Sequence, residues 1–364
     1  MFLPDIGSQT KKPTLFLGEG NFSFSASLVK MMVGRGECPD KVFFNNIWSS
    51  CFESDPTKLE LNEKNQEAVC VKEENKSFLI SRGCHVLESL DAEHLEEDER
   101  LSGTLFSKII FMFPHVGGKM KIDKNRRLLL NIIRSSRNVL SADGEIIITL
   151  CKGGYYKIKI MINDKTRFKG QGGTPFELVK RPPSDTWKIL DLINEADCIL
   201  TKVEFFPADQ FEEYRQVGYR GLHKMFNVTG SVIHTIRKME PRELSPISEL
   251  SREPPDSSSG GDQQQDFHSL YPLHHIHHLS FWLAEGETSL DNSLVLAVLQ
   301  QTGLEEILVR WSTVELYTNQ ARHSQTIQLE FSDPARPLGH SRMVHILINV
   351  LGKSLEACGR VSLR

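Results

Sequence analysis

A short apolar segment followed at once by glycines places the strongest constraint on the first half of this chain. Residues 15–17 form a continuous apolar run, which is typical of a central strand buried on both faces. Gly18, Glu19 and Gly20 follow directly, and the pattern through Met32 predicts a helix. A strand, a glycine turn and a helix bring a nucleotide-like ligand to a helix N-terminus. From glycine spacing alone, an ordinary turn in an α/β domain fits equally well.

Strands alternate with helices through the first 238 residues. Apolar runs predict further strands at 42–47, 84–87, 108–113, 145–150, 198–206 and 231–236. Amphipathic or capped segments predict helices at 54–82, 123–140 and 186–196. This alternation predicts a largely parallel, doubly wound sheet, with the last strand antiparallel. Ligands of such sheets bind outside the carboxyl ends of the strands, where the turns at Gly18 and Pro114 both lie.

Three motifs resemble, in order, those of the rRNA uridine-N3 methyltransferase-like family. The first is EGNFSFS at 19–25, and the second is FMFPHVGG at 111–118, with Met112 where the family usually has Asn. The third is split into LCKG at 150–153 and GQGGTP at 170–175. The resemblance covers residues 13–238 and implies an α/β Rossmann-like methyltransferase domain. It further implies S-adenosylmethionine as cofactor and N3 of a uridine in rRNA as methyl acceptor.

The resemblance also implies which residues form the site. Glu19 offers an acceptor for cofactor hydroxyls or its amino group, and Asn21 and Phe22 position the cofactor and stack on a ring. Asp91 follows the third strand and either reaches the adenine amino group or caps a helix. The full set of expected cofactor-binding residues is Gly18, Glu19, Gly20, Asn21, Phe22, Ser23, Asp91 and Pro114.

N3 of uridine lies on the Watson–Crick edge and carries a proton, which sets two requirements for the chemistry. The base must be unpaired or flipped out of its stack, and a positioned group must help to remove the proton. His115 is the candidate base, because imidazole accepts a proton near neutral pH. The sulfonium itself activates the methyl group, so the sequence predicts no catalytic metal.

Charge is segregated along the chain although the net charge is only −4. Residues 53–100 hold 14 acidic and 6 basic side chains, whereas residues 119–181 hold 15 basic and 5 acidic ones. Such segregation predicts a local phosphate-attracting face, although a solvated helix face fits as well. The candidate RNA-binding residues are Lys119, Lys121, Lys124, Arg126 and Lys152.

Residues 153–169 form an insertion that the family pattern lacks, and they interrupt its third motif. An extra hairpin that offers lysines to phosphates is one interpretation. An insertion that disables the loop is the other, and it is favoured. A second function therefore stays open, namely a non-catalytic RNA-binding or interaction protein that retains the methyltransferase fold.

The second half of the chain has its own pattern. Residues 239–268 are rich in Pro, Ser, Gly and Gln and predict a flexible linker. Residues 269–364 predict the order β-α-β-β-α-β, which is the α+β ferredoxin-like unit. The segments LYP at 270–272, HLSF at 278–281 and LEFSDPARPL at 329–338 resemble the ferredoxin-fold anticodon-binding domain of phenylalanyl-tRNA synthetases. This implies tRNA as a further partner, although His277 and His278 stand where Arg and Asp are common.

The histidines at 274, 275, 277 and 278 suggest a metal site, but neighbouring strand residues point to opposite faces and no thiol or carboxylate is close in sequence. The sequence therefore predicts no metal partner. The seven cysteines lack metal-site spacing and predict reduced thiols. No apolar run is long enough to span a membrane, and no leader pattern is visible, which predicts no membrane partner. A cytoplasmic location is expected, with the nucleus or nucleolus as alternatives.

Overall fold

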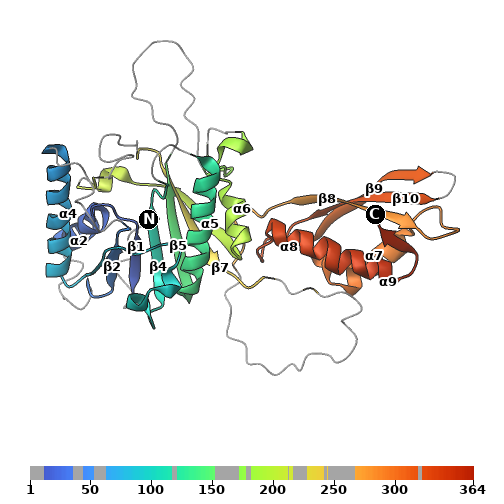
Figure 1. Ribbon diagram of the computed structural model, residues 1–364, viewed down its shortest axis with the longest axis horizontal. Coiled ribbons are helices and arrows are strands. Elements are labelled where there is room, and N and C mark those ends of the chain that lie inside the picture. Colours follow the sequence, from blue (N-terminus) through green and yellow to red (C-terminus); the bar gives the residue numbers. More distant parts are fainter. Residues whose placement is uncertain are drawn as a thin grey trace, which may run out of the picture. The chain divides into compact units, whose positions relative to one another are not determined.

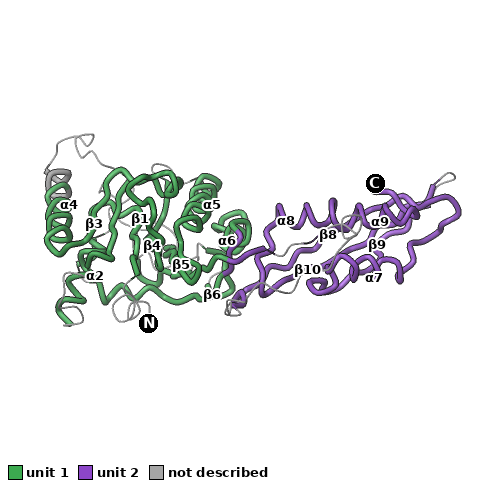
Figure 2. Tube along the Cα trace, turned by 90° about the horizontal axis from the view of Figure 1, so that it is seen from below, with its two compact units in different colours: residues 1–196, 200–238 green, residues 197–199, 239–364 purple. Residues whose placement is uncertain are grey.

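A computed structural model describes two compact units of the chain. The units are Met1–Ala196 with Leu200–Lys238, and Asp197–Ile199 with Met239–Arg364 (Figure 2). The described residues are 12–35, 44–52, 63–116, 121–151, 172–177, 182–211, 213–215, 228–241, 244, 267–318 and 322–364. Most of the predicted linker at 239–268 and the whole insertion at 153–169 lie outside them. Among the described residues, no helix is both long and apolar enough to cross a membrane.

The first unit is built on a seven-stranded sheet with the order β3-β2-β1-β4-β5-β7-β6. Neighbouring strands from β3 to β5 pair in parallel, and β7 pairs with β5 in the antiparallel direction, as the sequence predicts for the last strand. The strands are β1 (Thr14–Leu17), β2 (Ile47–Ser50), β3 (His85–Leu87), β4 (Phe106–Met112), β5 (Leu140–Leu150), β6 (Cys198–Phe205) and β7 (Val232–Lys238).

Helices cover both faces of this sheet. Figure 1 shows α2 and α4 on one side of the strands and α5 and α6 on the other. The helices are α2 (Ser23–Gly34), α4 (Glu63–Ser81), α5 (Ile122–Asn138) and α6 (Ile189–Glu195), with short 3-10 turns η2 (Leu95–Glu97), η3 (Glu99–Leu101), η4 (Pro183–Asp185) and η5 (Ala208–Gln210). α5 buries Leu129, Ile132 and Ile133 at helical spacing, so its charged side chains lie on the opposite face.

The second strand lies later than its predicted position at 42–47. β2 begins at Ile47, where Trp48 pairs with Leu15 of β1 and its indole stacks on His85 of β3 at 4.0 Å between ring centroids. Phe44 is buried but precedes the strand, in a helical turn. An apolar run marks burial without specifying which of its residues join the ladder, and strand pairing decided the register here.

The second unit contains a four-stranded antiparallel sheet with the order β11-β8-β10-β9. Its strands and helices follow the order β-α-β-β-α-β that the sequence predicts, except that the second helix is interrupted by a π-helical segment. The elements are β8 (His275–Leu283), α7 (Asn292–Gln301), η7 (Leu304–Ile307), β9 (Leu308–Thr318), β10 (His323–Phe331), α8 (His340–His345), η8 (Ile346–Gly352), α9 (Lys353–Ala357) and β11 (Val361–Leu363).

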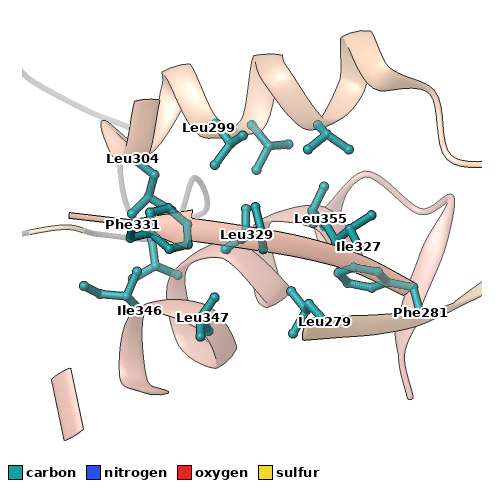
Figure 3. Packing of buried hydrophobic residues seen from close by; sticks show 14 of the residues in the cluster. Leu279, Phe281, Leu299, Leu304, Ile327, Leu329, Phe331, Ile346, Leu347 and Leu355 are labelled. Carbon is teal, nitrogen blue, oxygen red and sulfur yellow. The ribbon is translucent and has the colours of Figure 1, made fainter. Parts of the chain in front are cut away.

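One apolar cluster holds this second unit together. Phe281 of β8 and Leu329 and Phe331 of β10 are fully buried, and Figure 3 shows them beside Leu299 of α7 and Leu355 of α9. Alternate residues of β8 and β10 enter the cluster, as expected of strands with one buried face. The residues between them face outward. Residues two apart share a face, so His275 and His277 lie on one side of β8.

Candidate functional site

The first unit has one topological switch point, between β1 and β4. From β1 the chain proceeds outward to β2 and β3, whereas from β4 it proceeds the other way to β5. In open α/β sheets, ligands bind outside the carboxyl ends of the strands at such a point. Two turns border it, residues 18–22 after β1 and residues 113–116 after β4. These turns define the candidate site.

The glycine turn after β1 is specified by the neighbouring strand. Gly18 has φ +66°, and a Cβ atom there would lie 2.4 Å from Cε2 of Phe111 on β4. No other residue fits that position without a shift of the Phe111 ring. Gly18 and Gly20 are exposed, and Glu19 between them is buried. At the carboxyl end of β1, the turn therefore exposes its backbone at these two positions, because neither glycine has a side chain.

Glu19 serves the turn itself. Its carboxylate accepts hydrogen bonds from the backbone N of Ser25 at 3.1 and 3.2 Å and from the Ser25 hydroxyl at 3.0 Å. It thereby caps the first turn of α2, as acidic groups near helix N-termini do. Burial raises the pKa of the Glu19 carboxyl to about 7. The oxygens of Glu19 are buried and accept hydrogen bonds within the chain, and the expected bonds from cofactor hydroxyls stay a prediction.

The segment at residues 213–215 packs onto the glycine turn, which sequence reasoning did not foresee. The Asn21 side-chain amide and the Ser23 hydroxyl both donate to the carbonyl oxygen of Arg215 at 2.8 Å, and the Arg215 N–H donates back to the Ser23 hydroxyl at 3.0 Å. Tyr214 stacks on Phe113 with 6.3 Å between ring centroids. The signal in the sequence was the aromatic series at 206, 211 and 214, which follows the segment that forms β6.

Two expected cofactor residues have structural roles. Phe22 is fully buried in the apolar cluster between the sheet and the α2–α4 layer, so its ring is not available to stack on a ligand. Asp91 is exposed at the carboxyl side of β3, and its carboxylate accepts a hydrogen bond from the N–H of Glu93 at 2.9 Å. This bond closes a turn ahead of η2, whose N-cap residue is His94, so Asp91 does not cap that helix, and its contact with an adenine stays a prediction.

The turn after β4 orients His115. Phe113 has the left-handed φ of 56°, and the ring nitrogen Nδ1 of His115 lies 3.1 Å from the Phe113 carbonyl oxygen. A carbonyl only accepts, so Nδ1 carries the proton and Nε2 holds the basic lone pair. Asn125 of α5 accepts from the Val116 N–H at 2.8 Å and so fastens the turn to that helix. Pro114 is buried within the turn.

Met112, the departure from the family pattern, lies in the core at the end of β4. Its sulfur accepts a hydrogen bond from the Thr149 hydroxyl at 3.3 Å. Cys151 follows β5 at the same edge of the sheet, and burial raises the pKa of its thiol to about 12. This shift favours the protonated thiol over the nucleophilic thiolate.

The described basic residues at the start of α5 divide into two kinds. Lys121 and Lys124 are exposed, as a phosphate-binding role requires. Arg126 instead donates to the carbonyl oxygens of Thr186 at 2.7 Å and Ser184 at 3.0 Å, with its side chain only 18% exposed. Its guanidinium fastens the loop that precedes α6, and its contact with RNA stays a prediction. Lys119 and Lys152 lie outside the described residues.

Arg126→Ala is expected to lower the free energy of unfolding of the first unit by about 1–3 kcal/mol, because charged hydrogen bonds to two carbonyl groups are lost. Lys124→Ala, the matched control two residues earlier, is expected to change it by less than about 0.5 kcal/mol. Urea unfolding at low salt measures both. Equal stability of the two variants would contradict the assigned role of Arg126.

The described part of the third motif surrounds another buried carboxylate. The backbone N–H groups of Gly172, Gly173 and Thr174 donate to Glu177 at 3.0, 2.6 and 3.2 Å. The loop lies against β7. A Cβ atom added to Gly172 would be 3.0 Å from Nε2 of His234, a residue of β7. His234 is fully buried, and burial lowers the pKa of its imidazole to about 4.

Comparison with known proteins agrees with this architecture. Residues 15–218 match the BMT5-like family model, described as rRNA (uridine-N3-)-methyltransferase BTM5-like. Ferredoxin-fold anticodon-binding domain-containing protein 1 of Homo sapiens is 29% identical over 231 residues, which are 64% of this chain and 32% of that protein. Its homolog in Mus musculus is 28% identical over 229 residues, which are 63% of this chain and 31% of that protein.

A solved structure, that of the CcbJ methyltransferase from Streptomyces caelestis, is 14% identical to this chain, with a TM-score of 0.34. The match covers 64% of this chain and 85% of that one. The chain matches about a third of the length of the two curated relatives.

Proposed function

Because the chain belongs to the BMT5-like family of rRNA (uridine-N3-)-methyltransferase-like proteins, we propose that its first unit transfers a methyl group from S-adenosylmethionine to N3 of a uridine in RNA. One observation carries this proposal: the glycine turn and the His115 turn border the same switch point, from the ends of adjacent parallel strands. A cofactor held at one turn would have its reactive end next to a base held at the other.

The residues at the glycine turn fit a nucleotide-like cofactor. Gly18 and Gly20 are exposed and offer backbone without a side chain next to the N-terminus of α2. Asp91 supplies an exposed carboxylate after β3, and Pro114 shapes the opposite turn. Glu19, Asn21 and Ser23 hold these elements in place through their bonds to Ser25 and Arg215. S-adenosylmethionine, when bound, supplies a methyl group already activated by the sulfonium.

His115 removes the N3 proton in this proposal. Its Nδ1–H is directed to the Phe113 carbonyl, which leaves Nε2 as the basic nitrogen. The target uridine must be unpaired or flipped, since N3 is the atom used in Watson–Crick pairing. The exposed Lys121 and Lys124 supply phosphate contacts beside this turn.

A second candidate function is an RNA-binding protein that does not catalyse methyl transfer. The side chains of Asn21 and Ser23 favour it, because both are bonded to the Arg215 carbonyl, and so does the insertion at 153–169 within the third motif. The two functions differ in one measurable property, the binding of S-adenosylmethionine.

For the second unit, we propose the ferredoxin-like anticodon-binding fold and a tRNA partner. Support comes from the β-α-β-β-α-β order, the antiparallel strand order β11-β8-β10-β9, and the name of the human relative. The unit carries few basic side chains relative to acidic ones, and eight of the thirteen histidines of the chain lie at or after His268. We therefore expect weak tRNA binding at neutral pH.

Incubation of the full chain with rRNA and S-adenosylmethionine is expected to produce 3-methyluridine, detected by mass spectrometry of the digested RNA. His115→Ala is expected to lower the rate of formation about a hundredfold through loss of the general base. His94→Ala is the matched control, because this exposed histidine pairs with Glu97 at the surface. Absence of product from the wild type, despite cofactor binding, would instead support the non-catalytic function.

Gly20→Val is expected to weaken S-adenosylmethionine binding about tenfold or more, because a branched side chain there occupies the space above the turn. Gly20 does not have a positive φ, so its backbone does not require a glycine for that reason. Gly34→Val is the control, since a Cβ at Gly34 meets nothing within 4 Å. Calorimetry that finds equal affinity in both variants would place the cofactor elsewhere.

A further inference from the structure

Three histidines from two elements of the second unit lie close together. His275 and His277 lie two residues apart on β8 and therefore on the same face of the strand, and His340 is the first residue of α8. One ring nitrogen from each lies within 4.8 Å of the others. The ring centroids of His275 and His277 are 6.0 Å apart, and those of His277 and His340 are 6.1 Å apart.

The ring nitrogens are arranged as ligands are. Nε2 of His277 is buried and has no hydrogen-bond partner within the described structure, which is costly for a polar atom unless something binds it. Nε2 of His275 lies 2.6 Å from the carbonyl oxygen of Leu338. Metal-binding histidines commonly make such a contact with one ring nitrogen, which fixes the orientation of the other. Leu338 lies two residues before His340, so one loop contacts or carries both of the flanking ligands.

We propose that His275, His277 and His340 bind one divalent transition-metal ion, and that Zn²⁺ fits the site best. Tetrahedral Zn²⁺ with Zn–N bonds of about 2.0–2.1 Å requires nitrogens about 3.3 Å apart, so the side chains would rotate to close the site from nitrogens that now lie within 4.8 Å of one another. Imidazole ligands suit Zn²⁺, Cu²⁺ and Ni²⁺, whereas Ca²⁺ and Mg²⁺ require oxygen ligands that this cluster lacks. Three protein ligands leave a fourth position for water.

The ion would join the start of β8 to the start of α8, two segments that are far apart in the sequence. It would also add positive charge to a unit in which acidic side chains outnumber basic ones. This inference is independent of the proposed methyl transfer.

Titration of the tag-free, chelator-treated full chain with Zn²⁺ tests the proposal by calorimetry. We expect the wild type to bind one equivalent that His277→Ala and His340→Ala bind at least about tenfold more weakly. His340 is exposed, so its variant remains informative if His277→Ala fails to fold. His278→Ala is the matched control, because this exposed histidine lies on the opposite face of β8 and should leave the equivalent unchanged.

Co²⁺ in place of Zn²⁺ provides a readout of geometry. The wild type and His278→Ala are expected to show the visible absorption of tetrahedral Co²⁺, and His340→Ala is expected to lose it. Addition of Zn²⁺ should also raise the midpoint of thermal unfolding of the wild type but not that of His340→Ala. The proposal is overturned if the wild type binds no such equivalent, or if all variants bind it with the same affinity.

Discussion

Glu19→Gln is expected to stabilise the first unit at pH 8 by about 3 kcal/mol and to leave its stability near pH 4.5 almost unchanged. Burial raises the pKa of Glu19 to about 7 in the folded chain, from an ordinary value of 4.5. Between these values the folded state binds a proton that the unfolded state has released. The contribution of Glu19 to stability is therefore fully present below about pH 4.5 and is lost as the pH rises through 7.

Glutamine reproduces the neutral form of this side chain. Its amide oxygen can still accept from the Ser25 N–H, so the cap of α2 is retained while the ionisation is removed. Amide hydrogen exchange in β1 and β4, measured at several pH values, reports the stability of this unit without interference from the other. Glu97→Gln, at an exposed carboxylate, is the control and should show no such pH-dependent gain. If the difference in stability between Glu19→Gln and the wild type were the same at every pH, the ionisation of Glu19 would not be its cause.

At pH 4, His234→Gln is expected to raise the free energy of unfolding of the same unit by about 3 kcal/mol relative to the wild type. The pKa of His234 falls from 6.5 to about 4 because the ring is buried. Between pH 4 and 6.5, His234 binds a proton in the unfolded chain but not in the folded chain. Stability from His234 is thus present above about pH 6.5 and is lost as the pH falls.

The hydrogen bonds of His234 explain why the folded chain does not protonate its ring. Its Nδ1 lies 3.3 Å from the carbonyl oxygen of Ile148, while its buried Nε2 has no partner within the described residues. A proton on Nε2 would therefore introduce a buried charge without compensation. Glutamine keeps a donor for the Ile148 carbonyl. His94→Gln, at an exposed histidine, is the control, and equal acid sensitivity of the two variants would refute the role of His234.

The two groups act in opposite directions between pH 4.5 and 6.5. Their slopes largely cancel in the wild type, so its stability should change little there on account of these residues. Glu19→Gln alone should reveal the acid sensitivity of His234, and His234→Gln alone should reveal the loss of stability with rising pH from Glu19. The double variant should again be nearly flat. If the stability of the double variant instead changed with pH in this range, the two sites would be coupled.

Local patterns predicted most of the elements, because strand and helix formation depend on residues close in sequence. The alternation of apolar runs and amphipathic segments indicated the parallel sheet, and the rule for strand ends located the turns at Gly18 and Pro114. The position of β2 was wrong by several residues, because pairing with β1 determined which part of the apolar segment joined the sheet.

The candidate site was predictable only in part, because a side chain's role depends on what surrounds it. Glu19 was correctly placed at the turn, but only burial and the contact with Ser25 showed that it caps α2. Arg126 had the charge of an RNA-binding residue, yet its guanidinium lies within reach of the Thr186 carbonyl, 60 residues further along the chain. Sequence distance hides such contacts.

The sequence by itself determined the motifs, the alternation of elements and the charge segregation, since each is a property of residues in linear order. Only the tertiary structure decided which groups meet. Arg215 lies 192 residues from Ser23 and binds it directly. His275 and His277 belong to a histidine run divided between two faces of a strand, and the fold brings His340 to the face that those two share. Folding makes neighbours of distant residues because burial of the apolar core fixes the positions of strands and helices, and their polar side chains must then find partners where the chain has placed them.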